Sequence, residues 1–365
     1  CLADEARDIH AAAELGAMDG VEEVCAPRIH RRWRRLTSLL GLWGDKALTL
    51  PFFRNRTLAR RVARWLREDP PDVIHVYSSS MAQYALAPNG AEGDPRGLRI
   101  MQFAELDSDK WRQHAAQSWW PLSWIYRREA RKLLDFERLV ARRFDVSLVC
   151  SDREKVLFQE HIPDVEPTVL PNGVDVEHFQ SQGEEQRQPT TVIFTGVMDY
   201  EPNVHGVLWF VNECWPQLRR AFPDARLLIV GSRPLRSICQ LFRDGILVTG
   251  RVPETPPYFD RAAVAIAPLH LARGVQNKVL EAMSMGLPVV ATGNAAQGLG
   301  AVPPDTLIVA DTVADTVAAI HRLFNDPNQA REVGQRAAAF VRQHYTWERM
   351  FQILDNILNR VRTST

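Results

Sequence analysis

The sequence predicts an α/β protein with two domains, each built around a parallel β-sheet. Short, almost wholly apolar segments alternate with helical segments along most of the chain, which is typical of a parallel sheet covered by helices on both faces. This alternation stops at a polar stretch at residues 181–190 and then begins again. The length of 365 residues also favours two domains over a single core.

The first half of the chain contains four expected strands. A helix opens the chain, the strands lie at residues 73–77, 98–103, 145–150 and 167–170, and a long helix is expected at about 123–143. His75 lies inside the apolar first strand and is interpreted as a core histidine. Ser78 and the two serines after it predict the N-cap of a helix that runs to Ala87.

The second half contains six expected strands. They lie at residues 191–195, 226–230, 246–248, 264–267, 288–291 and 307–309, and a helix is expected at 204–221. We therefore predict a first domain at residues 1–180, a linker at 181–190, a second domain at 191–345 and a C-terminal helix at 346–365 that crosses back to the first domain. Because the opening residues Cys1-Leu2-Ala3 read as the tail of a strand, we expect the first domain to lack its first strand.

The composition argues against several classes of protein. The chain has 44 Lys and Arg and 44 Asp and Glu, so its formal net charge is zero and no nucleic-acid partner is expected. Five scattered cysteines without CxxC spacing argue against a zinc site or a disulfide framework and favour the cytoplasm. No Gly-x-Gly-x-x-Gly follows a strand, which argues against a dinucleotide-dependent dehydrogenase.

The segment from Gly274 to Met283, closed by an apolar strand at 288–290, is the strongest candidate for a binding site. A glycine before a helix lets backbone N–H groups approach a ligand closely. Lys278 in the first turn can meet a phosphate as a point charge, and Glu281 lies one turn later on the same face. A carboxylate can accept hydrogen bonds from sugar or ribose hydroxyls, so this pattern fits a nucleotide-sugar.

Three motifs together resemble a known family. They are Pro171-Asn172-Gly173-Val174-Asp175, Phe194-Thr195-Gly196, and Leu280-Glu281-Ala282-Met283 followed by Gly286-Leu287-Pro288-Val289-Val290. From about residue 72 onward the chain resembles a retaining glycosyltransferase of family 4 with the GT-B fold, in which two Rossmann-like domains face each other across a cleft. The segments at 107–111, 126–129, 251–253 and 272–278 are similar to bacterial sugar transferases associated with PEP-CTERM/exosortase exopolysaccharide systems.

The resemblance implies roles for matching residues. Glu281 would hold the ribose hydroxyls of a UDP- or GDP-sugar, Lys278 would neutralise its diphosphate, and Asp107 would face the sugar. Asn172 would line the cleft near the hinge, and the turn Gly250-Arg251-Val252 would hold the base through its backbone. The implied donor-binding set is Glu281, Gly196, Arg251, Val252, Gly274, Asn277 and Asn172, and the implied catalytic set is Asp107, Lys278 and Arg273.

Three features depart from the family pattern. Arg273 stands where many members have an acid, eight residues before Glu281, and Val197 stands where they have an arginine after Gly196. We expect Arg273 to replace that cation, because a guanidinium binds diphosphate in a bidentate manner. Family members also begin with a strand and a Gly-rich loop facing the acceptor, and we expect this chain to lack both. No metal is expected, and the Asp107-x-Asp109 spacing is interpreted as a helix cap.

The expected partners are a nucleotide-sugar donor and a glycan or polyprenyl-linked acceptor. The basic stretch at residues 28–67 has two interpretations, contact with the inner-membrane surface or a solvated helix face. The same alternatives apply to Trp119, Trp120, Trp124 and Tyr126, which are either interfacial aromatics or core residues. Two other functions stay open, a GT-B sugar-nucleotide epimerase and a non-catalytic nucleotide-sugar-binding partner.

Overall fold

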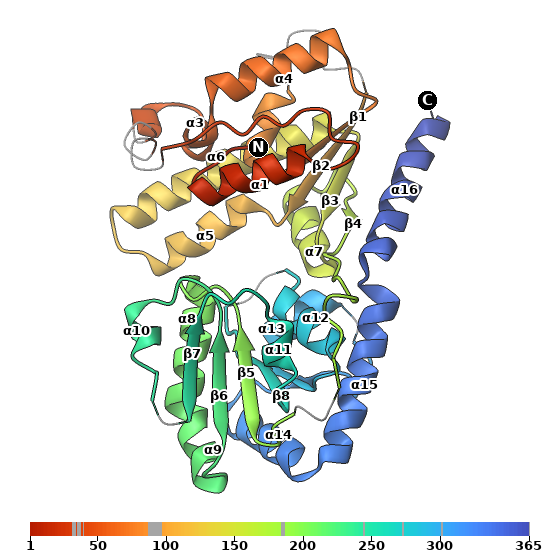
Figure 1. Cartoon of the computed structure of the whole chain (residues 1–365). Helices are drawn as coiled ribbons and strands as arrows, with labels where there is room; N and C mark the ends of the chain where they lie inside the picture. The colour runs from red at the N-terminus through yellow and green to blue at the C-terminus, as the bar shows by residue number, and fades with distance from the viewer. Residues whose placement is uncertain are drawn as a thin grey trace. The chain divides into compact units, whose positions relative to one another are not determined.

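The chain folds into two compact units, each with a parallel sheet (Figure 1). The computed structural model describes residues 1–30, 34, 38, 40–86, 97–183, 187–243, 245–271, 274–300 and 302–364. The first domain comprises Cys1–Cys150 and Glu154–Val169, and the second comprises Ser151–Arg153 and Leu170–Thr365. Two parallel-sheet domains confirm the predicted class, whereas the cleft between them stays a prediction.

The first domain has a four-stranded sheet in the order β1-β2-β3-β4. Its strands are β1 (Val73–Tyr77), β2 (Leu98–Ala104), β3 (Val146–Val149) and β4 (Thr168–Val169). The helices are α1 (Ala6–Gly16), η1 (Leu40–Trp43), α3 (Thr49–Phe53), α4 (Arg56–Glu68), η2 (Ser79–Tyr84), α5 (Asp107–Gln117), α6 (Leu122–Arg143) and α7 (Asp152–His161). Buried apolar side chains of β2, β3 and α6 form the core between sheet and helices.

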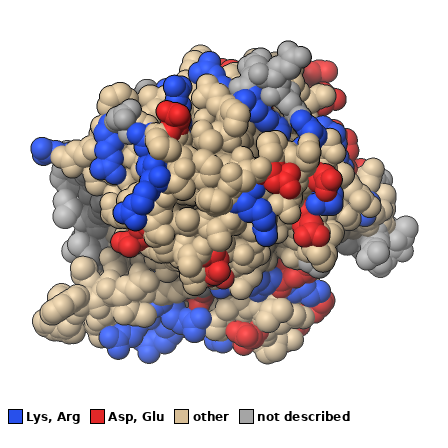
Figure 2. All heavy atoms as spheres, turned by 90° about the horizontal axis from the view of Figure 1, so that it is seen from below, with Lys and Arg blue, Asp and Glu red and all other residues tan. Residues whose placement is uncertain are grey.

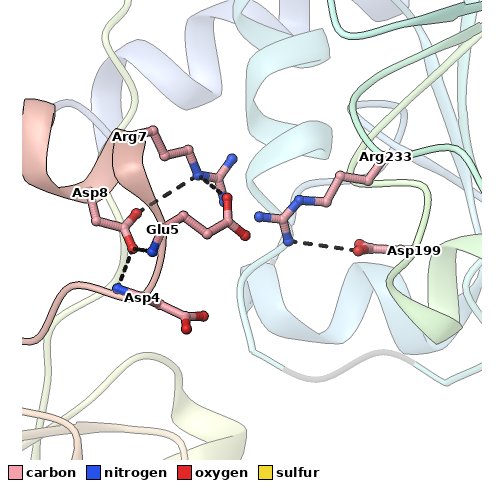
Figure 3. Close-up of polar contacts among 6 residues, drawn as sticks. All are labelled: Asp4, Glu5, Arg7, Asp8, Asp199 and Arg233. Carbon is pink, nitrogen blue, oxygen red and sulfur yellow. Dashed lines mark hydrogen bonds and ion pairs between the residues drawn. The ribbon is translucent and has the colours of Figure 1, made fainter. Parts of the chain in front are cut away.

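The start of the chain is held by local hydrogen bonds (Figure 3). The Asp8 carboxylate accepts from the backbone N–H groups of Asp4 and Glu5, both at 2.8 Å, and so fixes the first turn of α1. Ala3 is buried and makes an isolated parallel bridge with Arg28. Strand-like pairing is therefore present where the sequence indicated the tail of a strand.

Two expectations for β1 and the segment after it are wrong. His75 is exposed, as are Val73 and Tyr77, because β1 lies at the edge of its sheet in the described part of the chain. The helix expected up to Ala87 is the short 3₁₀-helix η2, and Ala87 lies outside the described residues. Ser78 does not cap η2 with its side chain; its backbone has a φ of 70° and its N–H donates to the Gln102 carbonyl.

The second domain has a six-stranded parallel sheet in the order β10-β9-β8-β5-β6-β7. The strands are β5 (Thr191–Thr195), β6 (Arg226–Val230), β7 (Ile246–Gly250), β8 (Val264–Ala267), β9 (Val289–Ala291) and β10 (Ile308–Val309). The helices are α8 (Glu201–Trp209), η5 (Phe210–Cys214), α9 (Trp215–Ala221), α10 (Arg236–Cys239), α11 (Pro256–Phe259), α12 (Asn277–Ser284), α13 (Gly293–Ala296), η6 (Gln297–Leu299), α14 (Val313–Asn325), α15 (Pro327–His344) and α16 (Trp347–Ser364).

The helix expected at 204–221 is divided by one π-helical segment, η5. Its predicted inner face is nevertheless buried, since Val204, Val207, Val211, Trp215 and Leu218 all belong to the core. In the π-helical segment the backbone hydrogen bonds span five residues instead of four, but the apolar side chains still lie on one face of the helix.

The end of α15 and the start of α16 hold the Pro171–Asp175 motif within the second domain. The Val174 N–H donates to the Tyr345 carbonyl at 2.7 Å, and a Cβ on Gly173 would lie 2.7 Å from the Trp347 ring. Glycine at 173 is therefore required by this close approach. That α16 crosses back to the first domain stays a prediction.

Two surface properties bear on the partners. The molecular face drawn in Figure 2 carries Lys and Arg among Asp and Glu, and neither sign covers it. No helix in the described part of the chain has both the length and the apolar character needed to cross a bilayer.

Candidate functional site

The candidate site of the second domain lies where three neighbouring strands end. Because β5, β6 and β7 are parallel, their carboxyl ends lie at one edge of the sheet, the usual ligand edge of such sheets. The loops there are in close contact: the Gly196 N–H donates to the Val230 carbonyl at 3.0 Å. A Cβ on Gly231 would lie only 1.7 Å from the Gly196 carbonyl oxygen, so this approach requires glycine.

Lys278 projects from the first turn of α12 onto this edge. Its Nζ donates to Asn203 Oδ1 and lies 5.0 Å from the centre of the Phe194 ring. The same nitrogen would lie 3.4 Å from a Cβ on Gly196, so the structure brings Lys278 and Gly196 together. Burial lowers the pKa of Lys278 to about 8, and the nearby Glu281 carboxylate opposes this shift.

Glu281 lies one turn further along α12 and is also partly buried. Burial raises the pKa of its carboxyl, whereas the positive charges of Lys278 and, to a smaller extent, His178 lower it. His178 Nε2 lies 3.4 Å from the Glu254 carboxylate, in the turn after β7. His178 thus contacts the segment that follows Arg251 and Val252.

The remaining predicted donor residues of the second domain occupy different environments. Asn172 Nδ2 donates to Asn277 Oδ1 at 3.1 Å, which places the Pro171–Asp175 motif at the N-terminus of α12. Gly274 has a φ of 58°, which favours glycine. Val252 packs partly against the core, and Arg251 is exposed just after β7. Arg273 lies outside the described residues.

Sequence reasoning missed three polar residues at this edge: Asn203, His178 and Arg233. Asn203 is buried in the first turn of α8, where its Nδ2 donates to the Val197 carbonyl at 2.9 Å while its Oδ1 accepts from Lys278. Arg233, in the loop after β6, lies 3.7 Å from Asp199 in the loop after β5 (Figure 3). For Asn203 and Arg233, a polar residue shortly after a strand that is closed by glycine was the available signal.

Asp107 belongs to the first domain, at the carboxyl end of β2. It accepts a hydrogen bond from the Ser79 hydroxyl at 2.9 Å. The interpretation of Asp107 and Asp109 as helix caps is wrong, because α5 begins at Asp107 and the buried Glu137 accepts from the Ser108 N–H. Asp109 is buried and pairs with Arg112, so the two aspartates have different partners.

Two family models match this chain, one in each half. Residues 22–178 match the model described as Glycosyltransferase Family 4, and residues 189–326 match Glycosyl transferases group 1. Both matches support a GT-B glycosyltransferase. Lys278, Glu281 and Gly196 all lie within the second match.

Curated relatives and solved structures are also similar to this chain. A GDP-mannose-dependent monoacylated alpha-(1-6)-phosphatidylinositol monomannoside mannosyltransferase from Corynebacterium glutamicum is 27% identical over 210 residues, which is 52% of this chain and 55% of that protein. An uncharacterized 44.6 kDa protein in the cps region of Klebsiella pneumoniae is 22% identical over 60% of each chain. The match thus spans little more than half the length of these relatives. Anabaena HepE in complex with UDP-glucose has a TM-score of 0.63 at 14% identity, covering 83% of this chain and 82% of that chain.

Proposed function

We propose that this glycosyltransferase moves a sugar from a nucleotide-diphosphate sugar to a glycan or lipid-linked acceptor, with retention at the anomeric carbon. The placement of Lys278 against the Gly196 loop, with Glu281 one turn away, carries the proposal. A cation then lies at the carboxyl end of β5, and a hydrogen-bond acceptor lies one helical turn away, which suits a diphosphate and a ribose.

The proposed chemistry depends on negative charge that develops on the leaving diphosphate. The Lys278 ammonium and the N–H groups at the N-terminus of α12 stabilise this charge. Arg273 adds a second cation, so the proposed reaction needs no metal. Glu281 accepts from the ribose hydroxyls, Arg251 and Val252 present their backbone to the base, and Asp107 meets the sugar from the first domain.

The donor and the acceptor are proposed as classes. HepE is bound to UDP-glucose and the Corynebacterium relative uses GDP-mannose, so both UDP- and GDP-sugars are candidate donors. That relative acts on a phosphatidylinositol mannoside, which supports a lipid-linked acceptor such as a polyprenyl glycan at the inner membrane. A cytoplasmic role in exopolysaccharide biosynthesis is proposed from the sequence resemblance.

Calorimetry with UDP-glucose and GDP-mannose tests the donor site. We expect Lys278→Ala to weaken binding of the preferred donor by about 30-fold or more, since a close charge pair at a partly buried site contributes at least about 2 kcal/mol. Lys155→Ala is the matched control, because Lys155 forms an ion pair with Glu166 in the first domain. Unchanged affinity in Lys278→Ala would refute the diphosphate role.

A turnover assay separates the proposed enzyme from the two alternatives. Release of UDP or GDP from the bound donor, measured with and without lipid-linked glycan acceptors, is expected for a transferase. Binding without any turnover would indicate the non-catalytic partner. Conversion of one sugar nucleotide into its epimer would indicate the epimerase.

A further inference from the structure

The turn between α5 and α6 carries an unusual group of exposed apolar side chains, which we name the aromatic tip: Trp119, Trp120, Leu122 and Trp124. Trp119 is 89% exposed, Trp120 is 82% exposed, and Leu122 and Trp124 are about half exposed. Exposed apolar patches on this scale usually mark interaction surfaces. The aromatic tip lies in the first domain and contains none of the predicted donor residues.

The aromatic tip lies away from the sheet because it is the turn between a helix that follows one strand and a helix that precedes the next. α5 follows β2 and α6 leads into β3, and the two helices lie side by side (Figure 1). Eleven residues make α5 about 16 Å long, so the turn lies roughly that far from the strand ends. Tyr126 is not part of the tip, because its ring packs against Trp111, 5.2 Å away, between the helices.

A fourth exposed tryptophan lies on a loop that packs against α6. Trp43, at the end of η1, is 94% exposed. The buried Arg128 of α6 donates to the carbonyls of Gly41 and Gly44, which flank Trp43 on either side. Arg128 lies one turn after Trp124 in α6, so the loop that carries Trp43 is held against the N-terminal half of that helix.

The charged side chains of the segment that carries the aromatic tip are all basic, whereas the loop of Trp43 also contains Asp45, an exposed acid 3.8 Å from Lys132. From Lys110 to Arg128 the sequence contains Lys110, Arg112, Arg127 and Arg128 and no Asp or Glu. Arg112 reaches back to Asp109, and Arg128 is used by the η1 loop, which leaves Lys110 and Arg127 as exposed cations. Exposed indoles beside cations complement the headgroup region of a bilayer that contains anionic lipids.

We propose that the aromatic tip, together with Trp43, docks the first domain on a membrane surface rich in anionic lipids. The indoles enter the headgroup region, where their N–H groups stay hydrated and their rings contact acyl chains. Arg127, in the second turn of α6, contacts lipid phosphates. The docked protein then meets an acceptor whose lipid part lies in that membrane.

The basic helix α4 is a weaker membrane surface than its sequence indicates. Arg61 pairs with Glu23 at 2.9 Å, and the Trp65 Nε1–H also donates to Glu23 at 2.6 Å. Arg64 pairs with Glu68 at 3.5 Å. Acids within the first domain therefore neutralise part of this face, whereas the aromatic tip has no acid within its own segment.

Vesicle sedimentation of the full chain tests the docking. We expect binding to vesicles of phosphatidylcholine with 30% phosphatidylglycerol and at least about fivefold weaker binding to phosphatidylcholine alone. The double variant Trp119→Ala/Trp120→Ala should reduce partitioning by about tenfold or more, because two indoles no longer leave water. Phe242→Ala is the control, since Phe242 is an aromatic residue of the second domain that is 63% exposed; it should bind as the wild type does.

Two further results decide between docking and its alternatives. Brominated acyl chains should quench tryptophan fluorescence in the wild type and much less in the double variant. Wild-type affinity of the double variant for vesicles would overturn the proposal. Binding to a soluble acidic polysaccharide without any vesicle binding would also overturn it and would assign the tip to a glycan. These outcomes are independent of donor binding, so failure here leaves the proposed reaction intact.

Discussion

Replacement of Lys278 by Met should change how the stability of the second domain depends on pH. Burial lowers the pKa of Lys278 from 10.5 to about 8, so the unfolded chain binds this proton more tightly than the folded chain does. A shift of this size destabilises the folded state by about 3 kcal/mol at pH 7, at about 1.4 kcal/mol per pKa unit. The cost is fully present below the folded pKa and disappears as the pH rises to the unfolded value.

The measurable quantity is the difference in unfolding free energy between the wild type and Lys278→Met. Met also removes the hydrogen bond to Asn203. Because that loss is independent of pH, it shifts the difference in unfolding free energy by a constant amount at every pH. Between pH 7 and pH 9 the wild type should gain about 1 kcal/mol relative to the variant, because the folded lysine becomes neutral over this range. Lys155→Met serves as the control and should follow the wild-type curve.

Urea unfolding at pH 7, 8 and 9 provides the assay. Hydrogen–deuterium exchange of peptides from β5 and β6 reports the second domain separately, because a protein with two domains need not unfold in one step. A wild-type minus variant difference that stays constant from pH 7 to pH 9 would refute the reasoning, since it would mean that Lys278 is as well solvated in the folded as in the unfolded chain.

Two further changes test other parts of the structure. Burial raises the pKa of Glu137 from 4.5 to about 8, so ionisation of this carboxyl favours the unfolded state as the pH rises above 4.5. Glu137→Gln should therefore stabilise the first domain by about 3 kcal/mol at pH 7 and hardly at all at pH 4. Urea unfolding at the two pH values measures this difference. Gly231→Ala should destabilise the second domain and weaken donor binding, because its Cβ would meet the Gly196 carbonyl. Gly183→Ala is the control for backbone strain alone, which should cost about 1–3 kcal/mol of unfolding free energy. Gly183 also has positive φ, but no atom beyond the adjacent residues lies within 4 Å of the position of its added Cβ. Equal losses in both glycine variants would contradict the contact argument.

Most strands of both domains were predictable because each is a short apolar run bounded by polar or turn residues. The exposure of individual side chains was less predictable. The apolar residues of β1 do not indicate that this strand lies at the edge of its sheet, because the edge position depends on which strands pair with one another. Tyr126 illustrates the same limit, since its pairing with Trp111 arises only when α5 and α6 lie side by side. The π-helical segment within the 204–221 helix has no comparable signal in the apolar pattern.

The candidate site was predictable where its residues are close in sequence. Lys278 and Glu281 share one helix, so their spacing alone indicated a common face. Asn203 is 75 residues from Lys278, and His178 contacts Glu254, which lies 76 residues later in the chain. Such contacts follow from the order of strands in the sheet, which the sequence does not state directly.

The Asn203 side chain keeps Lys278 engaged before any ligand arrives. Its amide oxygen holds the ammonium while its amide nitrogen is anchored to the Val197 carbonyl. An incoming anion must compete with this neutral acceptor, so monovalent anions such as chloride gain little from exchange. We expect a diphosphate, with its higher charge, to compete for Lys278 better than a monovalent anion does, so this edge of the sheet should discriminate among anions by their valence.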